Sequence, residues 1–136
     1  MKKKVERFED LIAWQKARAL SARIYKLTLQ PPIARDFTFC DQVRSAALSV
    51  PSNIAEGFER GGRAEFQHFL SIAKASCGEL RSDLYMASDL EYIDNKTMGL
   101  LMDSASEVSR IIGGLRRAVA AQRKRQSQSS VLSPQS

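Results

Sequence analysis

Residues 63–91, RAEFQHFLSIAKASCGELRSDLYMASDLE, hold the most regular apolar pattern in the chain. An apolar residue recurs there at alternating spacings of four and three. A repeat of 3.5 residues keeps one face of an α-helix turned toward a nearly parallel neighbour. The stretch therefore predicts a long helix that packs along its whole length. The residues of this face are Phe66, Leu70, Ala73, Cys77, Leu80, Leu84 and Ala87.

Three further segments carry helical periodicity, and clusters of proline, glycine or polar residues separate the four. None of them shows the two-residue alternation of a half-buried β-strand. Four such helices joined by short turns predict an all-α fold, an antiparallel up-down-up-down four-helix bundle. We expect its helices near residues 8–28, 36–58, 63–91 and 95–123.

The chain has 136 residues, of which 43% are hydrophobic. This supplies one compact core and excludes two independent ones. We expect a single four-helix-bundle domain over residues 1–123 and a disordered polar tail over 124–136, because QSQSSVLSPQS has no apolar period. No run approaches the roughly 18 apolar residues that span a bilayer. The sequence therefore predicts a cytoplasmic protein that makes no contact with a membrane.

Several residues are suited to the ends of the predicted helices. Asp36 and Asp94 stand where the second and fourth helices need an N-cap, and Gly57 stands where a left-handed residue ends the second helix. These residues predict where three of the helix ends lie.

Pro51 lies inside the second predicted helix. Proline has no amide proton, so we expect a bend near Val50 and an unbonded carbonyl one turn back, near Ala47. The side chains of Ser49, Ser52 and Asn53 are the predicted partners for the freed backbone groups.

No residue pattern indicates catalysis or a metal site. Glu65 and His68 have the Glu-x-x-His spacing of di-iron bundles, but such a site needs two of these pairs and the chain has one histidine. Cys40 and Cys77 stand alone and are predicted to be core residues. Glycine-rich phosphate-binding motifs are absent from the sequence. We therefore expect a non-enzymatic protein without a cofactor.

Both ends of the chain are basic and its middle is acidic. Residues 1–35 carry nine basic and three acidic groups, residues 110–136 carry six and none, and residues 76–109 carry two and seven. In an up-down-up-down bundle the N-terminus, the second turn and the C-terminus share one end. We expect this end to attract phosphate groups. Its predicted cations are Lys2, Lys3, Lys4, Arg7, Arg60, Arg63, Arg116, Arg117, Arg123, Lys124 and Arg125.

Residues 49–57, SVPSNIAEG, are the least ordinary stretch. With residues 41–44, DQVR, and residues 8–27, FEDLIAWQKARALSARIYKL, this stretch resembles the four-helix-bundle family encoded in intervening sequences of bacterial 23S ribosomal RNA genes. The likeness covers roughly residues 8–118. The motif positions that match are Gln42, Val43, Arg44, Ser49, Val50, Pro51, Asn53, Ile54, Ala55, Glu56 and Gly57.

The resemblance implies an all-α bundle that assembles as a ring, a homopentamer, and it implies no known reaction. The family is similar to the accessory variability protein of diversity-generating retroelements, a basic ring that binds nucleic acid and works with a reverse transcriptase. We interpret the motif itself as structural. Glu56 is expected to form salt bridges at the helix end, where it lies among Arg44, Arg60 and Arg63.

The sequence thus leads to two functions of different classes. The first is a non-enzymatic oligomeric protein that binds RNA or DNA through its basic end. Because the basic tracts contain no interleaved aromatic residues, phosphate attraction without sequence reading is the expected mode. The alternative is a helical scaffold that docks a protein partner.

Overall fold

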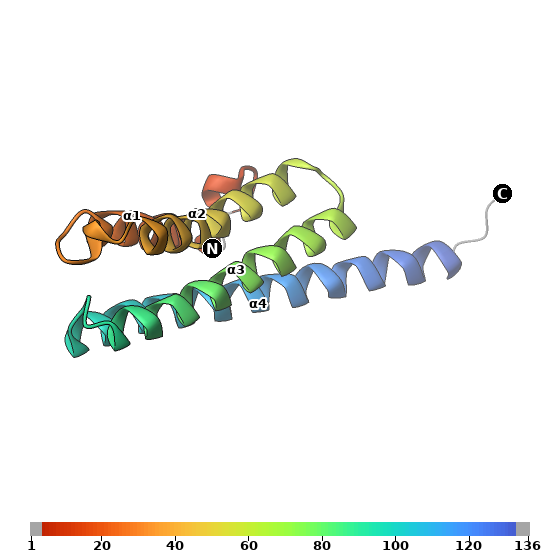
Figure 1. Ribbon diagram of the computed structural model, residues 1–136. Coiled ribbons are helices and arrows are strands. Elements are labelled where there is room, and N and C mark those ends of the chain that lie inside the picture. The colour runs from red at the N-terminus through yellow and green to blue at the C-terminus, as the bar shows by residue number, and fades with distance from the viewer. Residues whose placement is uncertain (1–3, 133–136) are drawn as a thin grey trace.

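The computed structural model describes residues 4–132, so the predicted site residues Lys2 and Lys3 lie outside the described residues. The elements are η1 (Phe8–Asp10), α1 (Ile12–Thr28), η2 (Ile33–Arg35), α2 (Phe37–Glu59), α3 (Arg63–Asp89) and α4 (Asn95–Leu132). Figure 1 shows α1 and α2 as one layer that lies over α3 and α4, with α4 extending past the other helices.

Each α-helix packs against the next along the chain, and α1 also packs against α4. This confirms the predicted antiparallel four-helix bundle. All four helices supply fully buried side chains, and the two cysteines are core residues as predicted. Burial raises the pKa of the Cys77 thiol, which donates a hydrogen bond of 3.1 Å to the carbonyl of Ala105. The largest buried side chains are Ile24, Ile33, Ile54, Leu70, Leu80, Leu84 and Ile112.

The predicted N-caps of α2 and α4 are confirmed. The Asp36 side chain accepts a hydrogen bond of 3.1 Å from the amide of Phe39, and Asp94 accepts one of 2.7 Å from the amide of Thr97. These carboxylates satisfy amides that have no partner within the first turn of a helix.

The predicted first helix, 8–28, is interrupted. Leu11 is extended, with φ −74° and ψ 123°, and separates the short η1 from α1. The Asp10 side chain accepts hydrogen bonds from the amides of Glu6 and Arg7, which closes a separate turn before α1 begins. Apolar periodicity does not reveal this break, because Leu11 is itself buried.

The prediction of a disordered tail from residue 124 was wrong for most of its length, because α4 continues to Leu132. The added residues are mainly Arg, Lys, Gln and Ser, and neither glycine nor proline interrupts them before Pro134. An existing helix extends through such residues at little free-energy cost. Residues 133–136 lie outside the described part of the chain.

Pro51 is buried within one continuous helix, as predicted, but the partner of the freed carbonyl differs from the prediction. The hydroxyl of Ser21, on α1, donates a buried hydrogen bond of 2.6 Å to the carbonyl of Ala47. Two of the predicted partners bond to each other instead: the Asn53 amide group donates to the carbonyl of Ser49 at 2.7 Å and to its hydroxyl at 2.9 Å. Another helix therefore satisfies the defect that proline leaves in α2.

We predict that Ser21→Ala lowers the free energy of unfolding by about 1–3 kcal/mol, because it leaves the buried Ala47 carbonyl without a donor. The same substitution should have a smaller effect in a Pro51→Ala background, where residue 51 regains its amide proton. Urea denaturation of the two single variants and the double variant measures this coupling. Equal losses in both backgrounds would contradict the assignment.

Gly57 does not end α2, contrary to the prediction. It lies inside the helix and is buried, whereas Gly61 supplies the left-handed residue after the helix, with φ 82°. A Cβ atom on Gly57 would lie 2.6 Å from the Cβ of Phe69. Glycine is required at this position because α2 and α3 approach each other closely there, and the glycine pattern alone does not distinguish the two roles.

We predict that Gly57→Ala destabilises the protein by about 1–3 kcal/mol, because two backbones must separate to admit the methyl group. Gly78→Ala is the matched control, since Gly78 is also inside a helix and has open space around its Cβ position. The free energy of unfolding of the control should rise by about 0.5–1 kcal/mol, because alanine has a higher helix propensity than glycine. Thermal or urea denaturation of both variants compares the two effects.

Candidate nucleic-acid interface

Four cationic side chains bridge α3 and α4, and each does so through a neutral hydrogen-bond acceptor. Lys74 donates to the hydroxyl of Ser109 at 3.2 Å, and Arg116 donates to the hydroxyl of Ser71 at 2.6 Å. The other two pairs are Arg123 with Gln67 at 3.2 Å and Arg63 with Gln126 at 2.7 Å. We call Arg63, Lys74, Arg116 and Arg123 the basic stripe.

All four cations of the basic stripe are exposed to solvent. Within residues 4–129, none of them forms a salt bridge with a carboxylate. A hydroxyl or amide acceptor positions a cation without neutralising it, so the stripe keeps its full positive charge. Each arginine also retains N–H groups beyond the one that it donates.

The basic stripe is long enough to contact several phosphate groups. On α4 its partners run from Ser109 to Gln126, which is about 26 Å at the ~1.5 Å rise per residue of an α-helix. This equals between seven and eight steps of ~3.4 Å along one strand of a duplex. The spacing suits contacts with a sugar–phosphate backbone.

The structure brings together only part of the predicted basic end. Arg63, Arg116 and Arg123 belong to the stripe, and Arg117, Lys124 and Arg125 are exposed on the same part of α4. Sequence reasoning missed Lys74, because nothing in its own segment marks it as a neighbour of the α4 arginines.

Two predicted cations have carboxylate partners instead. Arg7 lies 3.8 Å from Glu9 and 3.6 Å from Asp10. Arg60 forms salt bridges with Glu56 at 3.0 Å and with Glu65 at 3.6 Å. These pairs reduce the charge that either arginine offers to a phosphate.

Residues 4–7 do not extend to the end of α4. Val5 and Ile12 line a surface pocket together with Ile111 and Leu115, so the neighbouring Lys4 and Arg7, which are both exposed, lie near this level of α4. Figure 1 shows α4 continuing well past the start of α1. Arg123, Lys124 and Arg125 are at least eight residues beyond Leu115, or about 12 Å farther along the helix.

Comparison with known proteins identifies the family. Residues 9–114 match the 23S rRNA-intervening sequence protein family. The chain belongs to this family. A crystal structure of a protein of unknown function from the S23 ribosomal protein family of Bacteroides thetaiotaomicron is similar to the fold, with a TM-score of 0.71 and 21% identity. The alignment covers 77% of this chain and 98% of that one. No curated protein matches the chain.

The motif that carries the resemblance to the intervening-sequence proteins joins α2 to its neighbours. The hydroxyl of Ser49 shares a hydrogen bond of 2.7 Å with the hydroxyl of Ser76 on α3. It also accepts a hydrogen bond of 2.9 Å from the side-chain amide of Asn53. Arg44 donates a hydrogen bond of 2.7 Å to the hydroxyl of Thr28, and its guanidinium lies 5.2 Å from the ring centroid of Tyr25. These contacts agree with the structural interpretation of the motif.

The predicted environment of Glu56 was only partly right. Among Arg44, Arg60 and Arg63, the described structure pairs Glu56 with Arg60 alone. Arg44 is drawn toward α1 by Thr28, and Arg63 toward α4 by Gln126. Arg44 and Arg63 therefore each bond to a neighbouring helix and not to Glu56.

Within residues 4–132, no group of three or more His, Cys, Asp or Glu side chains could hold a metal ion. No described helix is both long and apolar enough to cross a membrane.

Gln42, the first residue of the motif, contacts a buried carboxylate. Its side-chain amide donates a hydrogen bond of 3.1 Å to Oδ1 of Asp83, which is only 5% exposed. Oδ2 of Asp83 has no partner in the structure. Burial raises the pKa of Asp83 and nearby Glu79 raises it further, while the bond from Gln42 lowers it.

We predict a pH-dependent difference in stability between the parent protein and Asp83→Asn. The folded state holds the Asp83 proton more tightly than the unfolded state, where the pKa is about 3.9. The free energy of unfolding of the parent, relative to Asp83→Asn, should therefore fall as the pH rises from about 4 toward the raised pKa, and then level off. Urea denaturation across this range tests the sign, and a constant difference would contradict it.

Proposed function

We propose that this intervening-sequence family member is a non-enzymatic, oligomeric protein of the cytoplasm that binds RNA or DNA through the basic stripe. The observation that carries the proposal is the pairing of four cations with neutral acceptors across α3 and α4. Phosphates bound there displace condensed counterions, which favours association with little dependence on sequence.

Assembly into a ring, as the family resemblance implies, strengthens this proposal. Under cyclic symmetry, every copy of the basic stripe has the same orientation relative to the axis of the ring. Contacts that are weak in one subunit then act together on one strand, because each later contact is intramolecular. We propose a homopentamer. A reverse transcriptase is a further proposed partner, and a scaffold that docks a protein is the alternative function.

We predict that Arg63→Glu, Arg116→Glu and Arg123→Glu, combined in one variant, abolish binding to generic RNA and DNA. Fluorescence anisotropy of a labelled oligonucleotide at several salt concentrations measures this. Four phosphate contacts per subunit give a slope of about −3 to −4 in log K against log salt. Light scattering of the parent protein tests the oligomer at the same time.

The matched control is Lys26→Glu, Arg35→Glu and Lys96→Glu, which makes the same charge change at the opposite end of the bundle. These residues are exposed, and they lie beyond the ~8 Å screening length of physiological salt from the stripe. The control should bind nearly as well as the parent. Circular dichroism verifies that both variants remain helical. If the stripe variant binds as tightly as the control, the proposed function fails.

A further inference from the structure

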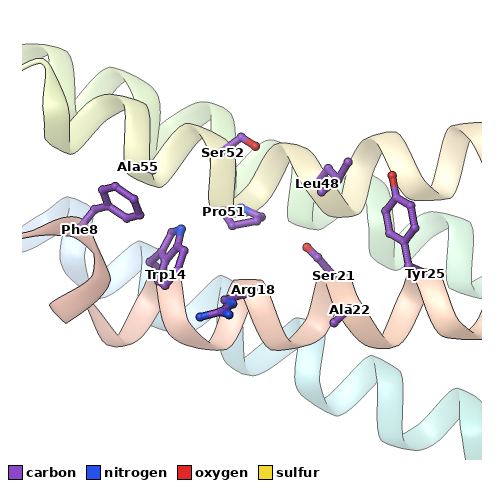
Figure 2. A pocket seen from close by; sticks show the side chains of 10 residues that line it. All are labelled: Phe8, Trp14, Arg18, Ser21, Ala22, Tyr25, Leu48, Pro51, Ser52 and Ala55. Carbon is purple, nitrogen blue, oxygen red and sulfur yellow. The ribbon is translucent and has the colours of Figure 1, made fainter.

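An apolar groove runs between α1 and α2 on the side of the bundle that faces away from α3 and α4 (Figure 2). Its volume is about 580 Å³. Figure 2 shows the rings of Phe8, Trp14 and Tyr25 in the space between the two helices, opposite Leu48 and Pro51.

The groove keeps large apolar side chains in contact with water. Leu48 is 46% exposed and Tyr25 is 36% exposed, although both lie beside the core. At one end of the groove Phe8 and Trp14 form an edge-to-face pair with ring centroids 5.0 Å apart. A contiguous apolar surface of this kind is typical of a binding site.

The groove carries one lining cation, Arg18, which lies over the Trp14 ring at 5.4 Å. Arg44 is not a lining residue, but its guanidinium lies 5.2 Å from the ring centroid of Tyr25, which does line the groove. The residues that line the groove include Arg18 and no acidic residue, and within the described chain neither arginine forms a salt bridge. A guanidinium that rests on an aromatic ring without a counterion suits a ligand that brings carboxylates to an apolar surface.

The shape of the groove suits a helix. From Trp14 to Tyr25 the wall formed by α1 is about 16 Å long, or three helical turns. An open groove between two helices accepts a third helix, whose apolar side chains recur at positions i, i+3 or i+4, and i+7.

We propose that this groove docks an acidic amphipathic helix of a partner protein. The apolar face of that helix covers Trp14 and Leu48, and a flanking Glu or Asp side chain pairs with Arg18, the cation that lines the groove. The proposal is independent of nucleic-acid binding, because no residue of the basic stripe lines the groove.

The chain carries its own reporter for this test, since Trp14 is its only tryptophan. The probes are two synthetic amphipathic helical peptides of about 18 residues, one of leucine and glutamate and one of leucine and lysine in the same pattern. The acidic peptide should shift the Trp14 emission to shorter wavelength and saturate. The basic peptide should bind about tenfold more weakly or not at all.

Two substitutions and a control locate the site. Leu48→Glu should weaken the acidic peptide about tenfold, and Arg18→Glu should reverse the preference toward the basic peptide. Leu100→Glu, on α4, introduces the same charge at a leucine that is 53% exposed and outside the groove, and it should change nothing.

Three results would overturn the proposal. Equal binding of both peptides would leave an apolar surface without charge preference. Equal weakening by Leu100→Glu and Leu48→Glu would place the peptide elsewhere. Absence of peptide binding, or a lower mass of unliganded Leu48→Glu in light scattering, would mean that the groove accepts no such helix or that a second copy covers it.

Discussion

The hydrogen bond from Ser21 to Ala47 is the constraint on which the arrangement of α1 and α2 depends. Pro51 removes the donor that the Ala47 carbonyl would use within α2, and a buried carbonyl without a donor is costly. Only a side chain from another helix satisfies it here, so α1 must lie at one register and one distance from α2. The same register sets Trp14 and Tyr25 opposite Pro51 and Leu48, which forms the apolar groove. A local backbone defect therefore determines a surface of the whole molecule.

The sequence predicted the four helices well because their information is local and redundant. In α3 seven apolar positions repeat the same period, so no single residue decides the outcome. The hydrogen bond to the Ala47 carbonyl is different. Its donor, Ser21, is 26 residues away in sequence, and serine is not part of an apolar pattern. Gly57 was misassigned for a related reason. A glycine near a helix end suits both a left-handed turn and a close helix contact, and only the position of Phe69 decides between them.

The sequence predicted that the candidate site is positively charged, but it did not predict which cations make up the site. Charge counting located the basic segments, yet which cations stay unneutralised depends on the carboxylates that the fold places beside them. Arg7 and Arg60 meet acidic residues, and therefore contribute less charge than expected. Lys74 joins the stripe through Ser109, a contact across 35 residues. Serine and glutamine acceptors leave the charge intact, and no sequence pattern distinguishes them from ordinary polar surface.

The two candidate surfaces belong to different layers of the bundle, the basic stripe to α3 and α4 and the apolar groove to α1 and α2. Both are positively charged, so a ligand at one could in principle weaken or strengthen binding at the other. Packed helices lie about 8–10 Å apart, and side chains add to this separation on either side. The surfaces are thus separated by more than the ~8 Å screening length of physiological salt. Their charges act almost independently under those conditions, and occupancy of the groove by an acidic helix leaves the stripe free to contact phosphates. Strong coupling between the two therefore requires a movement of α1 and α2 against α3 and α4, and the shared core resists such a movement.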